Sequence, residues 1–240
     1  MTAASVMQIV HRVRPGTHNP RTVFIVKLAA AIGIGLLAAT IATAGAQTAM
    51  TGDEMLSRAA ASDNLMSYSV PVQFAVHMRR PIGVRAKVEG IVYYKAPVEA
   101  ALVLTKVPSI IGGLFKGSYK LDMTPQTWSA QYAVRLVSNE QAGGVPVYVL
   151  QASPKTDAPD IDHIEITITQ DGYDPKSIVW FYRDKSSIRL TMVNQHLSGA
   201  ALPKTQSITV EMPQYGLDAV ATYGDYALNA PVSYDVFRSR

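Results

Sequence analysis

Tyr68-Ser-Val-Pro-Val-Gln-Phe-Ala-Val-His-Met78 is the stretch that decides the fold of this chain. Its even positions are all apolar, and its odd positions are mostly polar or small. Because successive side chains of a strand point to opposite faces, this alternation predicts a β-strand with one apolar and one polar face. Pro71 has no backbone N–H to donate to a neighbouring strand, so it predicts an edge position or a bulge.

The same period of two continues along the chain. Arg80-Pro-Ile-Gly83 indicates a turn into a second strand over 84–95, which Pro97 ends. No alternation of strands with helices occurs, and this argues against a parallel nucleotide-binding sheet. Further strands are expected at 99–107, 134–138, 145–152, 164–169, 178–183, 187–194, 205–212 and 219–228.

Two helices are expected beside the strands. Thr51-Gly-Asp-Glu54 has the spacing of a capping box, in which the side chains of Thr51 and Glu54 satisfy the first backbone N–H groups of a helix. The apolar residues that follow at helical spacing predict an amphipathic helix over 51–63. Thr124-Pro125 predicts a second, short helix near 125–131.

These elements predict one mainly β (α+β) domain over residues 47–240. Its sheet is expected to be a single antiparallel meander curled into an incomplete β-barrel, with the two helices covering the apolar inside. From the pattern alone, the apolar rows are either a packed core or the lining of a ligand cavity, and the packed core is the commoner outcome.

Residues 1–46 have the organisation of a secretory signal peptide. A basic stretch ends at Lys27, an apolar run extends from Leu28 to Ile41, and Ala44-Gly-Ala46 fits a signal peptidase. We predict cleavage before Gln47 and export by the Sec pathway to the periplasm, since the leader has no Arg-Arg pair. The alternative is an uncleaved membrane anchor, because the apolar span approaches the length of a membrane-crossing helix.

The charge distribution argues against nucleic acid as a partner. Residues 1–46 hold four of the 22 basic residues and none of the 18 acidic ones, so residues 47–240 are formally neutral. A nucleic-acid-binding surface is normally strongly basic. The absence of cysteine excludes disulfides, thiolate metal sites and a cysteine nucleophile.

No catalytic constellation is present in the sequence. The H-E-x-x-H, G-x-S-x-G and P-loop patterns do not occur. In Asp157-Ala-Pro-Asp-Ile-Asp-His163, three carboxylates and an imidazole have the donors for a hard cation. A solvated acidic loop before a strand is the alternative that we favour. We therefore expect a protein that is not an enzyme and that uses no metal and no cofactor.

Several stretches resemble the periplasmic outer-membrane lipoprotein-carrier (LolA/LolB-like) family. Val88-Glu-Gly-Ile-Val-Tyr-Tyr-Lys-Ala-Pro97 is similar to its second-strand motif of glycine, aromatic, basic residue and proline. The ranges 132–155 and 165–183 resemble its central hairpin and the next one. Tyr223–Phe237 resembles its closing strand and asparagine–proline–phenylalanine tail. The resemblance extends over roughly residues 51–237, and the order and spacing of the stretches carry it.

The resemblance implies a monomeric carrier with an apolar cavity that holds the acyl chains of a lipid or lipoprotein without covalent chemistry. It also implies an inner-membrane donor and an outer-membrane acceptor. A sensor or interaction module on the same scaffold, contacting a membrane protein in envelope-stress signalling, is the alternative function. The residues expected to line the cavity are Val70, Val72, Phe74, Val76, Met78, Val92, Tyr94, Trp180 and Met192.

The chain departs from the family pattern at two places. Carriers of the best-known kind have an arginine directly before the second-strand proline, which helps to hold the lid closed. Here Ala96 takes that position, and the neighbouring Lys95 is the candidate for a lid latch. Lysine lacks the planar, bidentate donor geometry of arginine. The insertion within 108–132 replaces a short hairpin of the family.

Overall fold

The computed structural model describes residues 50–59, 65–81, 83–96, 99–109, 118–121, 131–156 and 160–238. In these residues the chain forms the α-helix α3 (Gly52–Ala59), the 3-10 helix η1 (Tyr234–Phe237) and twelve strands. The strands are β1 (Ser67–Arg80), β2 (Val84–Lys95), β3 (Glu99–Lys106), β4 (Ser118–Leu121), β5 (Tyr132–Ala142), β6 (Val145–Pro154), β7 (Ile161–Thr169), β8 (Pro175–Tyr182), β9 (Ser187–Leu197), β10 (Ala200–Glu211), β11 (Gly216–Tyr223) and β12 (Ala227–Leu228).

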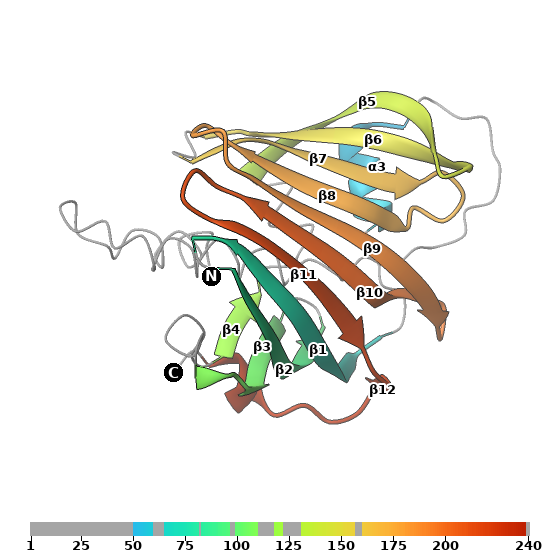
Figure 1. The fold of residues 1–240 in the computed structure, drawn as a ribbon. Coiled ribbons are helices and arrows are strands. Elements are labelled where there is room, and N and C mark those ends of the chain that lie inside the picture. Colours follow the sequence, from blue (N-terminus) through green and yellow to red (C-terminus); the bar gives the residue numbers. More distant parts are fainter. Residues whose placement is uncertain are drawn as a thin grey trace.

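The strands form one antiparallel sheet in the order β4-β3-β2-β1-β11-β10-β9-β8-β7-β6-β5, and β12 pairs with β1. The sheet is strongly curved, but β4 and β5 lie at its two ends and do not pair with each other (Figure 1). This arrangement confirms the predicted mainly β fold with an incomplete barrel. Among the described helices, none is long and apolar enough to cross a membrane.

The stretch Tyr68–Met78 forms most of β1, which lies inside the sheet, so the edge position that Pro71 predicted as one of two alternatives is wrong. β1 pairs with β2 on one side and with β11 and β12 on the other. Pro71 faces the break between β11 and β12, and its carbonyl oxygen accepts a hydrogen bond from the N–H of Gly224 at 2.9 Å. The missing N–H of Pro71 is therefore tolerated because it falls where the neighbouring ladder is interrupted.

The capping box predicted at the start of the first helix is present. The N–H of Thr51 donates to Oε2 of Glu54 at 2.8 Å, and the N–H of Glu54 donates to Oγ1 of Thr51 at 3.2 Å. α3 is described to Ala59, so the rest of the range predicted for this helix, 60–63, lies outside the described residues. The helix predicted near 125–131 also lies outside them, except for Gln131.

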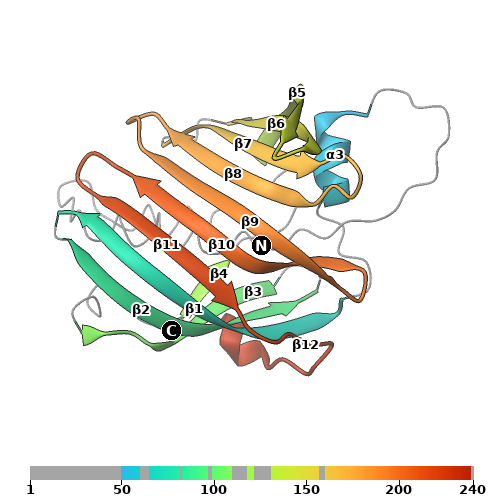
Figure 2. The same cartoon turned by 45° about the vertical axis from the view of Figure 1, so that its right-hand side comes forward.

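α3 lies beside β5, near the ends of β6, β7 and β8 (Figures 1 and 2). Met55, Leu56 and Ala59 belong to the same buried apolar cluster as the concave face. The helix approaches β5 closely, since a Cβ added to Gly52 would lie 2.7 Å from the carbonyl oxygen of Val134. α3 therefore covers part of the concave face, as predicted for the first helix.

The close approach of α3 to β5 gives a testable prediction. In an open helix, alanine is more stable than glycine by up to about 1 kcal/mol. In Gly52→Ala the new methyl group would meet backbone atoms that no side-chain rotation can move, so we expect a net loss of about 1–3 kcal/mol in the free energy of unfolding. Urea unfolding followed by circular dichroism measures it.

Gly83→Ala is the matched control, because a Cβ at Gly83 would have nothing within 4 Å. We expect its free energy of unfolding to stay within about 0.5 kcal/mol of the wild type. A Gly52→Ala variant as stable as the wild type would show that α3 does not rest on β5 in this way.

Candidate functional site

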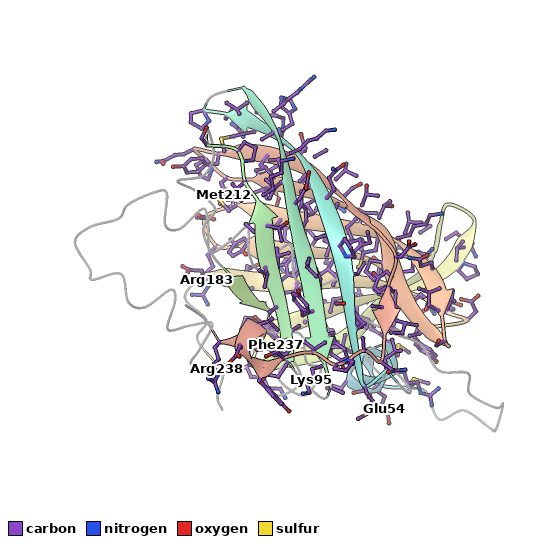
Figure 3. The ribbon with its side chains drawn as sticks, turned by 90° about the horizontal axis from the view of Figure 1, so that it is seen from below. Glu54, Lys95, Arg183, Met212, Phe237 and Arg238 are labelled. Carbon is purple, nitrogen blue, oxygen red and sulfur yellow. The ribbon has the colours of Figure 1, made fainter. Side chains whose placement is uncertain are left out.

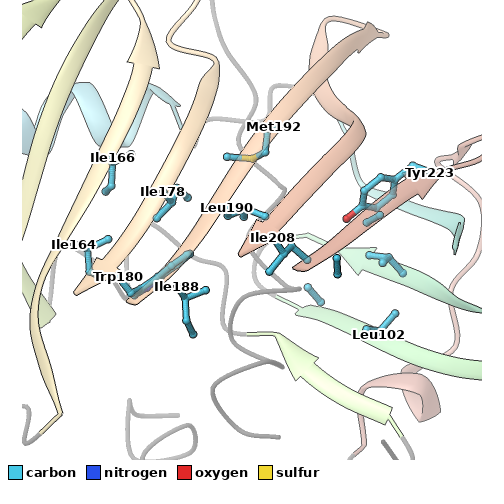
Figure 4. Packing of buried hydrophobic residues seen from close by; sticks show 14 of the residues in the cluster. Leu102, Ile164, Ile166, Ile178, Trp180, Ile188, Leu190, Met192, Ile208 and Tyr223 are labelled. Atoms are coloured by element: carbon cyan, nitrogen blue, oxygen red, sulfur yellow. The ribbon is translucent and has the colours of Figure 1, made fainter. Parts of the chain in front are cut away.

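The concave face of the sheet carries continuous apolar rows that run across the strands. One row crosses seven neighbouring strands, β1, β11, β10, β9, β8, β7 and β6. It has one residue on each strand, and each residue pairs in register with the residue on the next strand. Its members are all buried, and they are Val76, Ala219, Ile208, Leu190, Ile178, Ile166 and Leu150. Figure 4 shows Ile166, Ile178, Leu190 and Ile208 on the same side of neighbouring strands.

A parallel row lies two residues further along each strand. It contains Met78, Leu217, Val210, Ile188, Trp180, Ile164 and Ala152, again in register and again buried. The sheet is strongly curved (Figure 2), and both rows belong to one buried apolar cluster of the described residues.

The structure places all nine predicted cavity residues in this surface. Eight of them are buried members of one cluster, and Tyr94 is partly buried and packs against it. The residues are Val70, Val72, Phe74, Val76, Met78, Val92, Tyr94, Trp180 and Met192. Their common location follows from the pairing of β1 with β2 and, through β11 and β10, with β9 and β8, because register partners lie on the same face. Ligand binding by these residues remains a prediction.

Lys95, the predicted latch, contacts the C-terminal tail. Its Nζ lies 3.6 Å from the centre of the Tyr234 ring, a cation–π contact with η1. Figure 3 shows Lys95 at the same end of the sheet as Phe237 and Arg238. η1 packs on the outer face, where Phe237 and Ala101 belong to a separate small cluster. A role of Lys95 in closing a lid stays a prediction.

Four tyrosines interrupt the apolar surface at one end. The rings of Tyr68 and Tyr94 stack at 5.2 Å, Tyr226 meets Tyr68 edge-on at 5.5 Å, and Tyr223 stacks on Tyr226 at 6.4 Å. The hydroxyl of Tyr223 donates to Oε1 of Gln206 at 2.7 Å. We call these five residues the tyrosine–glutamine cluster.

Gln206 lies in the middle of an otherwise apolar row. Its register partners are Met192 on β9 and Ala221 on β11, and Ala221 in turn faces Phe74 on β1. Gln206 is fully buried, and its Nε2 has no hydrogen-bond partner in the described part of the chain. The hydroxyl of Tyr68, also fully buried, lacks a partner there too.

The sequence predicts Tyr68 only as part of the apolar face of the first strand, and it does not single out Gln206, Tyr223 or Tyr226. The alternation of side chains could have drawn attention to Gln206. It is two and four positions before Ile208 and Val210, so it lies on the inward face of the predicted strand. A polar residue at an inward position either has a partner or has a function. The tyrosines gave no such signal, since a phenol at an apolar position is ordinary in a core.

The acidic segment 157–163, for which a solvated loop was favoured over a cation site, lies partly outside the described residues. The Nδ1 atom of His163 contacts Oδ2 of Asp162 at 2.7 Å, and its ring stacks on Phe181 with centres 4.5 Å apart. Within the described residues, no group of three or more histidine or acidic side chains could hold a metal ion. Asp157 is not among those residues.

Comparison with solved structures shows which fold this is. A DUF1329 family protein from Desulfovibrio piger superposes with a TM-score of 0.60 at 12% identity, over 78% of this chain and 95% of the other. A LolA superfamily protein from Nitrosomonas europaea gives 0.58 at 13% identity, over 79% and 98%. The chain has the LolA-like half-barrel fold. The fold expected from the resemblance is thereby confirmed.

A further solved structure agrees with this half-barrel fold. A putative outer membrane lipoprotein-sorting protein domain from Vibrio parahaemolyticus gives a TM-score of 0.56 at 11% identity, over 73% of this chain and 90% of the other. No family model and no curated protein matches the sequence. At these identities the half-barrel is shared, while the residues that line it are this chain's own.

Burial of the phenols makes the stability of the half-barrel sensitive to high pH. Burial is the main cause that raises the pKa of Tyr68, Tyr182, Tyr223 and Tyr226. An unfolded tyrosine titrates near pH 10. The unfolded chain therefore releases these protons first, and stability present below pH 10 is lost above it. Each phenol lowers the free energy of unfolding by up to about 1.4 kcal/mol per pH unit there.

Tyr68→Phe tests this expectation. It removes one titrating phenol that has no described hydrogen-bond partner, so we expect neutral-pH stability to be kept and the decline above pH 10 to be shallower by one proton. Urea titrations between pH 8 and pH 11.5 give the slope, and Tyr234→Phe, at a residue that is 60% exposed, is the control. Equal slopes for Tyr68→Phe and the wild type would contradict the prediction.

Proposed function

We propose that this protein is an extracytoplasmic carrier that holds the acyl chains of a lipid or lipidated protein, non-covalently, against the concave face of its half-barrel. The observation that carries the proposal is the pair of unbroken apolar rows from β1 to β6, on the inside of a sheet whose ends β4 and β5 do not pair. An acyl chain is long, thin and apolar, and these rows match it in shape and chemistry.

Both the energetics and the fold support a carrier. Each methylene of a ligand that leaves water contributes about 0.8 kcal/mol. The comparison structures include a LolA superfamily protein and a lipoprotein-sorting domain, and this chain shares their half-barrel. The proposed route is Sec export to the periplasm through the leader 1–46, with an inner-membrane donor and an outer-membrane acceptor as partners.

The rows are covered in the structure, and the cover must move for a ligand to enter. The row residues are at most 9% exposed. α3 is the described part of the cover, and it contributes the buried side chains Met55 and Leu56. A hydrocarbon chain that replaces such side chains meets the same apolar surface. Binding is then an exchange of apolar contacts, which suits reversible loading and release.

A pair of adjacent substitutions on β1 tests the carrier. Val76 faces inward between Ala219 and Ala86, whereas Ala75 is exposed on the outer face. In Val76→Phe the larger ring should occupy the space over the rows and weaken binding of a fluorescent acyl probe to the delipidated protein at least tenfold. Ala75→Phe should bind within twofold of the wild type.

Native mass spectrometry of the purified chain, before and after lipid extraction, supplies the second measurement. We expect a mass increment that matches an acyl-containing molecule, present before extraction and diminished in Val76→Phe. Circular dichroism spectra show whether each variant is folded. A delipidated wild-type protein that binds no apolar probe would overturn the carrier.

A further inference from the structure

β5 gives the sheet a long exposed edge. It pairs with β6 on one side and with no described strand on the other, and Figure 1 shows it at the end of the curved sheet. From Arg135 to Ala142 none of its residues is buried, and the apolar side chains of Leu136 and Val137 are exposed. A strand edge of this length presents unpaired backbone N–H and C=O groups to which a further strand can bond.

The register of β5 and β6 shows which backbone groups of β5 point away from the sheet. The carbonyl oxygen of Gln131 accepts a hydrogen bond from the N–H of Lys155 on the β6 side at 2.8 Å. Because the backbone groups of a strand alternate between its two edges, Arg135, four residues further on, also points its groups toward β6. Val134 and Leu136 therefore point theirs toward the other edge.

A bulge inverts this alternation once along β5. The pairing with β6 shifts between Leu136 and Ser138, which makes Val137 the extra residue. Beyond the bulge, Asn139 points its backbone groups toward the outer edge. At the other end, a Cβ on α3 would meet the carbonyl oxygen of Val134, so the accessible part of the edge begins after that residue.

We propose that this edge pairs with the same edge of a second copy of the chain, as two antiparallel β5 strands related by a two-fold axis. In the register that fits, Leu136 lies opposite Asn139 of the partner subunit, and Arg135 lies opposite Glu140 of the partner subunit. Six residues from each strand make a small interface, so the dimer is reversible. The inference is independent of the proposed carrier function, and it differs from the monomer that the resemblance implies.

Charge complementarity selects this register. Arg135 and Glu140 are exposed, and within the described residues neither forms an ion pair. Arg135 donates its Nε–H to Gln151 at 3.0 Å, and Oε1 of Glu140 accepts from Ser138 at 2.6 Å, so Nη1 of the arginine and Oε2 of the glutamate stay available. Both side chains lie on one face of the sheet, because their register partners on β6, Gln151 and Val147, are four residues apart. The two-fold axis makes the ion pair twice.

Backbone geometry supports the same register. Leu136 and Asn139 both point their backbone groups toward the outer edge, so when they lie opposite each other across the axis they exchange two hydrogen bonds. Arg135 and Glu140 then form the next pair, whose backbone groups point away from the partner. Side chains approach each other most closely in pairs of this kind, and opposite charges stabilise them.

Charge reversal in the purified full chain tests the pairing. Arg135→Glu and Glu140→Arg each put like charges opposite each other twice, so each should weaken dimerisation in sedimentation equilibrium at least tenfold. The double variant Arg135→Glu/Glu140→Arg exchanges the two charges and should return the dissociation constant to within threefold of the wild type. Arg189→Glu, at an exposed position on the interior strand β9, is the matched control and should stay within twofold.

A single introduced cysteine reports the position of the axis, because the chain has no cysteine of its own. In the proposed register the two copies of Val137 flank the axis, within the separation of about 7 Å between Cα atoms that a disulfide tolerates. Val137→Cys should therefore form a cross-linked dimer under mild oxidation. Val193→Cys, on β9, should not, although Val193 is 56% exposed and Val137 is 54% exposed.

The outcomes decide whether a second copy occupies this edge. A wild-type chain that stays monomeric at millimolar concentration would overturn the proposal, and this is also the result expected if the edge takes a segment of another protein instead. A dimer that tolerates both single reversals, or that the double variant does not restore, would overturn the register. Equal cross-linking of Val137→Cys and Val193→Cys would do the same. Binding of an acyl probe is measured separately, so the carrier stands or fails by its own test.

Discussion

The pairing of β1 with β11 is the interaction on which the rest of the structure depends. It joins the N-terminal strands β1–β4 to the C-terminal strands β5–β11, and it sets Val76 opposite Ala219. Because side chains alternate between faces, a slip of one residue would turn the apolar set of β1 toward water. This register therefore makes two apolar half-sheets into one concave surface, and it places the candidate site.

The same surface shows where packing and function compete. An interior built only for stability would have an aliphatic residue at Gln206, between Met192 and Ala221. The chain instead has an amide whose oxygen is bound by Tyr223 and whose nitrogen is free among the described residues. Departures of this kind from the best local choice are expected at functional or strained sites. Here Gln206 lies beside Tyr223, which belongs with Tyr68, Tyr94 and Tyr226 to one set of contacting rings.

Local rules were sufficient for much of the fold. The alternation from Tyr68 to Met78 placed β1, the turn before Gly83 placed β2, and the spacing of Thr51 and Glu54 gave the capping box of α3. All nine candidate cavity residues fell on one face for the same reason. Pro71 suggested an edge strand, but β1 is paired on both sides. The N–H that Pro71 lacks would point at the interruption between β11 and β12, and this interruption is visible only once the strands are paired.

The sequence by itself determined which side of each strand is apolar, where the strands turn, and that no cysteine chemistry is available. Tertiary structure decided which strands became neighbours, that β4 and β5 stay apart, and that Tyr68, Tyr226 and Tyr223 bring their rings into contact. The physical reason is range. Periodicity and capping act over a few residues, whereas register partners such as Val76 and Ala219, 143 positions apart, are brought together only by the pairing of β1 with β11.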